Sequence, residues 1–250
     1  MNNSLIFNPP VIAHRGASHL APENTMAAFI KAAQLGAKWV EFDVMLAASG
    51  EAIIFHDETL SRTTNGKGMV AESTFTKLST LDAGGWFAPQ YSGERIPLLK
   101  DVLQFLKEMN MAAVVEIKPL VGEEEQTVLR TLEAVDALFK ERDSSILFSS
   151  FSLPSLKYLR QRSHHCQIGL LLDEWEPGWE QKCLNLKCVS VHVNEAILTQ
   201  EKANKIKEMG MKLCAYTVND LSRASELYAI GVDALFTDVP DQLINGKIIE

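Results

Sequence analysis

Histidine, acidic and basic residues in this chain often follow short apolar runs, where a β-strand would give way to a loop. His14 and Arg15 are the first such pair. An imidazole can move protons near neutral pH, and a guanidinium offers an anion such as phosphate a planar fork of donors. His56 ends another apolar run. We therefore regard His14 and His56 as candidates for proton transfer and Arg15 as a candidate anion-binding residue. The alternative for each is a structural role.

Three carboxylates are also expected to converge. Glu41 and Asp43 are two residues apart in an extended run, so their side chains share one face of the strand. Glu116 and Lys118 repeat this spacing further along the chain. Carboxylate oxygens with no cysteine nearby are typical ligands of a hard divalent ion such as Mg²⁺ or Ca²⁺. The alternative is a set of buried ion pairs without metal, Glu116 with Lys118 and Glu41 with Arg15.

Short apolar runs and helix-like patterns alternate over most of the chain. The predicted strands cover residues 11–14, 39–45, 52–56, 113–117, 146–150, 167–171, 188–192, 212–217 and 234–237. The predicted helices cover residues 24–35, 98–109, 123–140, 153–161, 199–209 and 221–229. Gly36, Gly210 and Gly231 are expected to end three of these helices. Thr199 and Asp220 are expected to cap two of them at the N-terminus.

This alternation favours a parallel sheet built of βα units. If residues 39–56 are one strand followed by an antiparallel or extended partner, about eight main strands remain, the number in a TIM-type (β/α)8 barrel. A doubly wound open sheet is the second choice. In a barrel, the carboxyl ends of the strands meet at the mouth that holds the active site. Further polar residues at these ends are Asp57, Ser150, His192, Asn194, Tyr216, Asn219 and Asp238. For His192 the sequence supports two positions equally, one in the lining of the pocket and one in the core.

Residues 57–97 interrupt the alternation. They are rich in Thr, Gly, Ser and aromatic residues and show no long helical pattern. A structureless loop of this length is unusual, so we expect a small insertion that rests on the barrel mouth. With this insertion, residues 1–250 are expected to form a single domain.

Composition narrows the classes of function. A net charge of −8 without long Lys/Arg runs argues against a general nucleic-acid binder. The four cysteines include no Cys-x-x-Cys pair, which favours ordinary thiols of a reduced compartment. The first residues lack the pattern of a signal peptide, and no apolar run is long enough for a membrane span. We expect a cytoplasmic protein that acts on a small molecule. The sequence does not indicate an oligomeric state.

Seven short motifs together resemble the glycerophosphodiester phosphodiesterase family. They are His-Arg-Gly at 14–16, Pro-Glu-Asn-Thr at 22–25, Glu-Phe-Asp at 41–43, His-Asp at 56–57, Glu-Ile-Lys at 116–118, Tyr-Thr-Val-Asn at 216–219 and Thr-Asp at 237–238. Each motif alone is weak, but they occur in order over nearly the whole chain. The segment 170–175 and the missing signal peptide resemble the bacterial cytoplasmic branch.

The resemblance implies a TIM-type barrel with a small insertion after the second strand. It also implies a metal-dependent enzyme that hydrolyses glycerophosphodiesters, such as glycerophosphocholine or glycerophosphoethanolamine, to sn-glycerol 3-phosphate and an alcohol. Glu41, Asp43 and Glu116 match the family's metal ligands. His14 and His56 match its acid–base pair, with His14 as the expected base and His56 as the expected acid. Whether water or a substrate hydroxyl attacks is left open.

By the same resemblance, Arg15 and Lys118 match the phosphate contacts. Tyr216 stands where many members have Trp, and it retains an aromatic wall for the glycerol. Glu23, Asn24 and Thr25, which the pattern first marks as a helix start, are also expected to brace the loop that holds His14 and Arg15. Two alternatives remain: the same site acting on lysophospholipids or inositol phosphodiesters, and a non-catalytic barrel that binds a phosphate ligand.

Overall fold

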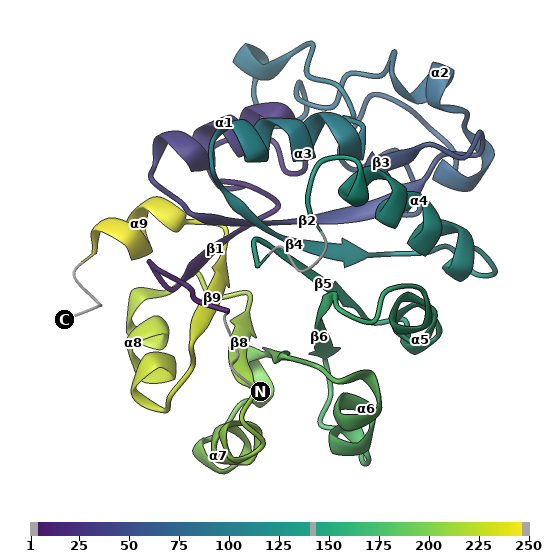
Figure 1. Cartoon of the computed structure of the whole chain (residues 1–250). Helices are drawn as coiled ribbons and strands as arrows, with labels where there is room; N and C mark the ends of the chain where they lie inside the picture. The colour runs from purple at the N-terminus through teal and green to yellow at the C-terminus, as the bar shows by residue number, and fades with distance from the viewer. Residues whose placement is uncertain (1–4, 141–143, 247–250) are drawn as a thin grey trace.

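Residues 5–140 and 144–246, the part of this computed structural model that is described, form a ring of parallel strands surrounded by helices (Figure 1). The strands are β1 (Val11–His14), β2 (Trp39–Leu46), β3 (Ala52–Ile54), β4 (Ala112–Ile117), β5 (Ile146–Ser150), β6 (Gln167–Leu172), β7 (Ser190–Asn194), β8 (Lys212–Tyr216) and β9 (Ala234–Thr237). All neighbours in the ring pair in parallel, while β3 lies antiparallel to the end of β2.

The ring is closed because β1 pairs with both β2 and β9. His14 lies beside Glu41 in the first pairing, and Ile12 lies beside Phe236 in the second. Apart from β3, eight strands of the described residues make up the barrel. The predicted TIM-type barrel is therefore confirmed, and the open sheet is wrong.

Helices follow most of the strands and cover the outside of the barrel (Figure 1). They are α1 (Met26–Gln34), α2 (Phe75–Leu78), α3 (Leu99–Glu108), α4 (Glu124–Asp136), α5 (Leu153–Arg162), α6 (Trp179–Leu186), α7 (Gln200–Glu208), α8 (Leu221–Ala229) and α9 (Pro240–Asn245). Short 3₁₀ helices cover Val70–Glu72, Pro89–Tyr91 and Glu195–Ile197. The six predicted helices are present, whereas α2, α6 and α9 were not predicted.

The expected helix ends are confirmed. The side chains of Thr199 and Asp220 accept hydrogen bonds from backbone N–H groups in the first turns of α7 and α8. Gly36, Gly210 and Gly231 follow α1, α7 and α8 with φ of 85°, 73° and 94°. These local signals end each helix where the chain must turn back into the next strand.

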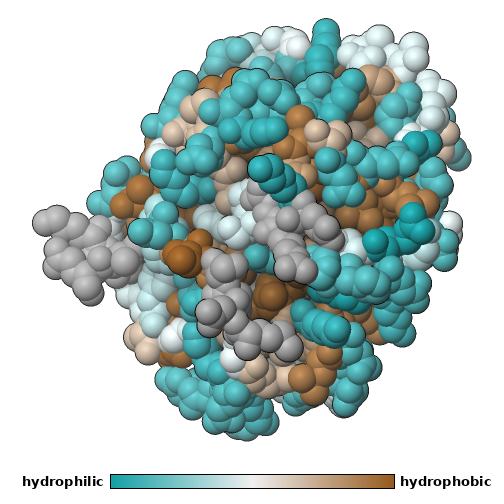
Figure 2. Space-filling model, viewed as in Figure 1, coloured by the Kyte–Doolittle hydropathy of each residue, from teal (hydrophilic) through white to brown (hydrophobic). Residues whose placement is uncertain are grey.

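Side chains alternate between two cores across the barrel wall. Val40, Phe42 and Val44 point outward and pack with helical residues such as Phe29. On the inner side, Trp39 belongs to a separate cluster at the strand starts, together with residues of the opposite strands. The helices expose their polar faces, so hydrophilic side chains cover most of the surface seen in Figure 2. The inner face of β2 is thus free to carry polar groups towards the carboxyl end.

The segment between β3 and α3 contains only short helices, as the sequence predicted. It has a small apolar core of its own, to which Leu60, Val70 and Leu78 contribute. Met45 of β2 and Ile53 of β3 belong to the same core. The β2–β3 hairpin therefore joins this segment to the barrel. That the segment and the barrel form one domain stays a prediction.

Candidate active site

A cavity of about 210 Å³ lies at the carboxyl ends of the strands. The lining residues are His14, Arg15, Glu41, His56, Glu116, Lys118, Ser149, Phe151, Leu171, Tyr216, Thr217 and Phe236. Of the eight residues that the family resemblance assigns to the site, all except Asp43 are in this lining. That residue is buried, but its carboxylate contacts two cations of the lining, so it belongs to the same site.

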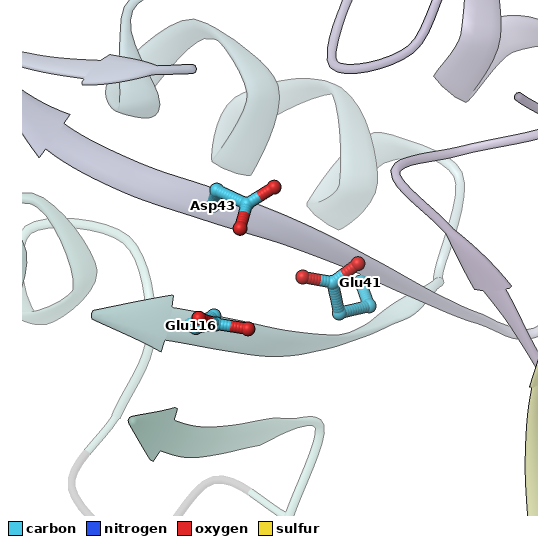
Figure 3. A group of neighbouring side chains, drawn as sticks. All are labelled: Glu41, Asp43 and Glu116. Atoms are coloured by element: carbon cyan, nitrogen blue, oxygen red, sulfur yellow. The ribbon is translucent and has the colours of Figure 1, made fainter. Parts of the chain in front are cut away.

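Three carboxylates meet in this site (Figure 3). Glu41 and Asp43 project from β2, and Glu116 projects from β4, directly beside Asp43 in the strand pairing. One carboxylate oxygen from each residue lies within 4.8 Å of the others. Both neighbouring cations approach Asp43: Arg15 Nε at 3.5 Å and Lys118 Nζ at 3.8 Å. The ion pairs therefore differ from those considered from the sequence, which joined these cations to Glu41 and Glu116.

The electrostatics of these carboxylates differ. Burial, together with the charges of Asp43 and Glu116, raises the pKa of Glu41 well above its ordinary value. Burial and the charge of Asp43 raise the pKa of Glu116 to about 8. The pKa of Asp43 is lowered despite its burial, because Arg15 lies beside it. The neighbouring cations therefore do not neutralise Glu41 and Glu116. A set of ligands made only of carboxylate oxygens fits a divalent ion such as Mg²⁺ or Ca²⁺.

His14 ends β1 with its ring between two carboxylates. Its Nδ1 is 2.7 Å from Asp238 Oδ1, and its Nε2 is 3.9 Å from Glu41 Oε2. Asp238 also accepts hydrogen bonds from Ser18 Oγ at 2.8 Å and Asn219 Nδ2 at 2.7 Å. A carboxylate bonded to Nδ1 fixes the ring orientation and leaves Nε2 for the cavity.

His56, just after β3, repeats this arrangement. Its Nδ1 is 2.6 Å from Asp57 Oδ1. Burial lowers the pKa of His56, although the charge of Asp43 acts in the opposite direction. The cavity therefore holds two imidazoles, each with a carboxylate on Nδ1, which is an arrangement suited to proton transfer on two sides of one substrate.

The loop after β1 is held in an unusual backbone conformation. Arg15 and Asn24 have φ of 55° and 57°, and Gly16 has φ of 83°. A Cβ on Gly16 would lie 2.7 Å from the backbone of Ala28, so only glycine fits there. Glu23 accepts a hydrogen bond from Arg15 Nη1 at 2.7 Å.

The expected bracing of this loop by residues 23–25 is confirmed. Besides the contact of Glu23, Asn24 Nδ2 donates to Asp43 Oδ2 at 2.8 Å. Thr25 caps α1 by accepting from the backbone N–H of Ala28. The loop is therefore tied both to the carboxylates and to the first helix.

The sequence left the place of two residues of the region open. Arg62, which the sequence analysis did not single out, donates hydrogen bonds to both Asp57 and Glu23. It lies in the Thr-rich segment, where no periodic pattern predicts which side chain points to the site. His192 is not in the cavity lining. It is buried in the barrel, bonded to Ser190 Oγ at 2.9 Å, and burial lowers its pKa to about 3.

Several known proteins resemble this chain over most of its length. The model of the Glycerophosphoryl diester phosphodiesterase family matches residues 14–242. A glycerophosphodiester phosphodiesterase of Caldanaerobacter subterraneus subsp. tengcongensis is 35% identical over 94% of this chain and 96% of its own. A structure of an Oleispira antarctica phosphodiesterase, in complex with the product sn-glycerol-3-phosphate, has a TM-score of 0.92 and 37% identity, covering 95% of this chain and 96% of that one. A glycerophosphodiester phosphodiesterase from Agrobacterium tumefaciens has a TM-score of 0.80 and 28% identity, covering 94% and 98%. This chain belongs to the glycerophosphoryl diester phosphodiesterase family.

Proposed function

We propose that this glycerophosphodiester phosphodiesterase cleaves its substrate with a divalent cation and two histidines, releasing sn-glycerol 3-phosphate and an alcohol. The observation that carries the proposal is the convergence of two histidine–carboxylate pairs and a three-carboxylate cluster on one cavity. The product found in the Oleispira antarctica relative supports the same substrate class. Glycerophosphocholine and glycerophosphoethanolamine are the substrates that we expect.

Arg15 and Lys118 would bind the phosphate. Both line the cavity, and Arg15 Nε is buried without a hydrogen-bond partner among the described residues. A phosphodiester carries one negative charge that repels nucleophiles, and cations placed beside its oxygens reduce this repulsion. When bound by Glu41, Asp43 and Glu116, a divalent cation would supply further positive charge to the phosphoryl oxygens.

The two histidines would divide the proton transfers. His14 is assigned as the base that takes the proton of the attacking hydroxyl while its oxygen forms the new bond to phosphorus. His56 is assigned as the acid that gives a proton to the alcohol oxygen as the old P–O bond breaks. Asp238 and Asp57 on the Nδ1 atoms support these roles, because each holds Nε2 free for the cavity.

An aromatic wall is part of the cavity lining. Tyr216, Phe151 and Phe236 form it, with edge-to-face contacts between the rings. The Tyr216 hydroxyl is buried and has no hydrogen-bond partner among the described residues. The ring of Tyr216 lines the cavity, which supports the placement of the glycerol on this wall.

Helices long and apolar enough to cross a bilayer are absent from residues 5–140 and 144–246. The cytoplasmic location stays a prediction. The alternative substrates share the phosphodiester group. Lysophospholipids differ by an acyl chain on the glycerol that stays with the phosphate, and inositol phosphodiesters differ by releasing inositol as the alcohol.

The test is release of the phosphate monoester from a panel of these diesters, with and without EDTA: sn-glycerol 3-phosphate from glycerophosphodiesters and lysophosphatidate from lysophospholipids. We expect EDTA to abolish turnover and Mg²⁺ or Ca²⁺ to restore it. His14→Ala and His56→Ala should each lower kcat by about 10²-fold or more. His19→Ala is the matched control, since His19 is exposed and outside the cavity lining. Full activity of either histidine variant would disprove the acid–base assignment. Binding of every diester without turnover would favour the non-catalytic barrel.

A further inference from the structure

Arg62 makes four hydrogen bonds to two carboxylates that belong to different loops. Its Nε and Nη2 donate to the two oxygens of Asp57 at 2.6 and 2.8 Å. Its Nη1 and Nη2 donate to the two oxygens of Glu23 at 2.7 and 2.8 Å. The guanidinium is thus engaged in a bidentate way on both sides, although the side chain is 44% exposed. Such paired contacts are geometrically specific.

Each of these carboxylates also holds a residue of the cavity. Asp57 Oδ1 is the partner of His56 Nδ1 at 2.6 Å, and Glu23 Oε1 accepts from Arg15 Nη1 at 2.7 Å. A continuous series of hydrogen bonds therefore runs from His56 through Arg62 to Arg15. Arg62 itself is not in the cavity lining. It reaches the site only through the two carboxylates.

Glu23 and Asp57 would repel one another without Arg62. The single atom Nη2 is 2.8 Å from an oxygen of each, so the two carboxylates lie close together. Hydrogen bonds from Arg62 hold the pKa of Asp57 well below its usual range, with His56 as a smaller contributor. Loss of Arg62 would remove the cation that lies between Asp57 and Glu23, while these carboxylates would keep their contacts with His56 and Arg15.

We propose that Arg62 is a positioning residue that fixes His56 relative to Arg15, and hence the proton donor relative to the bound phosphate. This inference rests on the proposed function of those two residues. A lysine cannot replace the arginine, because an ammonium group offers a point charge and cannot bond both carboxylates in a bidentate way. The chemistry of Arg62 therefore depends on its fork of donors as well as on its charge.

The test compares Arg62→Ala and Arg62→Lys with wild type, with Mg²⁺ supplied. We expect kcat for release of sn-glycerol 3-phosphate to fall by about 10²-fold in Arg62→Ala, since small misplacements of catalytic groups have effects of this size. We expect Arg62→Lys also to fall well below wild type. Guanidinium ion in solution should partly restore Arg62→Ala, whereas methylammonium should not. The affinity for inorganic phosphate, measured by calorimetry, should weaken roughly tenfold, because Glu23 would position Arg15 less well without its hydrogen bonds from Arg62.

Arg223 provides a matched control. It also bridges two carboxylates, those of Glu195 and Glu226, but it lies on α8 and is absent from the cavity lining. Arg223→Ala and Arg223→Lys should keep the kcat and phosphate affinity of wild type. Wild-type kcat in Arg62→Lys, or equal losses in the variants of Arg62 and Arg223, would overturn the positioning role. An inactive wild type would count against the proposed function instead, and phosphate binding would then decide the role of Arg62.

Discussion

Glu41, Asp43 and Glu116 share one buried volume, so the ionisation of each depends on the others. The raised pKa of Glu116, about 8, is the clearest consequence. Because this value lies above the ordinary 4.5, the folded chain keeps a proton that the unfolded chain has lost between these pH values. The contribution of Glu116 to stability is therefore fully present below pH 4.5 and is lost as the pH rises to about 8.

This linkage gives a prediction for Glu116→Gln in metal-free protein. Glutamine keeps the shape of the protonated acid and cannot ionise. Between pH 4.5 and about 8, the free energy of unfolding should therefore fall less steeply in the variant than in wild type. The difference in slope should be up to about 1.4 kcal/mol per pH unit. Urea denaturation across this range, after treatment with EDTA, measures it.

Glu133→Gln is the control for this experiment, because Glu133 is 62% exposed on α4. Its stability curve should run parallel to that of wild type. A parallel curve for Glu116→Gln as well would mean that Glu116 ionises normally in the folded chain. The argument for an uncompensated carboxylate cluster would then fail.

At the level of secondary structure, most of the barrel was predicted from the alternation of short apolar runs with helix-like patterns and from the residues that begin and end helices. The bounds of β1, β5, β9 and α8 agree with the prediction residue for residue. The strand predicted at 188–192 lies two residues later, as β7 (Ser190–Asn194), because apolar Cys188 and Val189 extend the pattern before the pairing begins. The missed α6 and α9 are short and begin after irregular residues, Gly178 and Val239. Such helices depend on packing rather than on a long periodic pattern.

The site residues also divide into those that a periodic pattern placed and those that no pattern placed. Glu41, Asp43 and Glu116 could be placed from the sequence because the alternation of a strand fixes which face a side chain takes. Arg62 and its contact with Glu23 could not, since both lie in loops and the residues are 39 apart. The sequence left His192 undecided between the pocket lining and the core, because a strand residue can point into the barrel and still lie outside the cavity lining, against Phe236.

Packing of β6 against β7 gives a second prediction. Gly169 lies beside Ser190 in the pairing, and a Cβ there would be 2.6 Å from His192 Nε2 and 2.7 Å from Ser190 Oγ. The interior of the barrel therefore has no room for a methyl group at this point. Gly169→Ala should destabilise the fold by about 1–3 kcal/mol, as overpacking of a core does. Chemical denaturation measures the loss.

A double-mutant cycle with His192→Ala tests the cause. Removing the ring should relieve the clash, so Gly169→Ala/His192→Ala should be less destabilised than the sum of the single variants. Strict additivity would show that the methyl group and the ring do not interact.

For the whole molecule, the barrel and the segment between β3 and α3 are joined through the β2–β3 hairpin and through hydrogen bonds between loops. The small core of the segment includes Met45 and Ile53, whose strands also form the barrel wall. Asp57 and Arg62 lie in the segment, and Glu23 lies in the loop after β1. Contacts from the segment therefore reach both the barrel wall and the candidate active site. If they couple the two parts, the chain unfolds as one unit.

The matched variants Leu60→Ala and Leu227→Ala test this coupling. Both leucines are fully buried, Leu60 in the core of the segment and Leu227 between helix and barrel. Each truncation should cost about 2–5 kcal/mol. In a single cooperative domain, both variants lower the midpoint of the same calorimetric transition, with equal calorimetric and van't Hoff enthalpies. Two transitions, of which Leu60→Ala moves one and Leu227→Ala the other, would show that the segment is a separate unit. The single-domain prediction would then be wrong, and the hydrogen bonds of Arg62 would have to hold together two parts that fold independently.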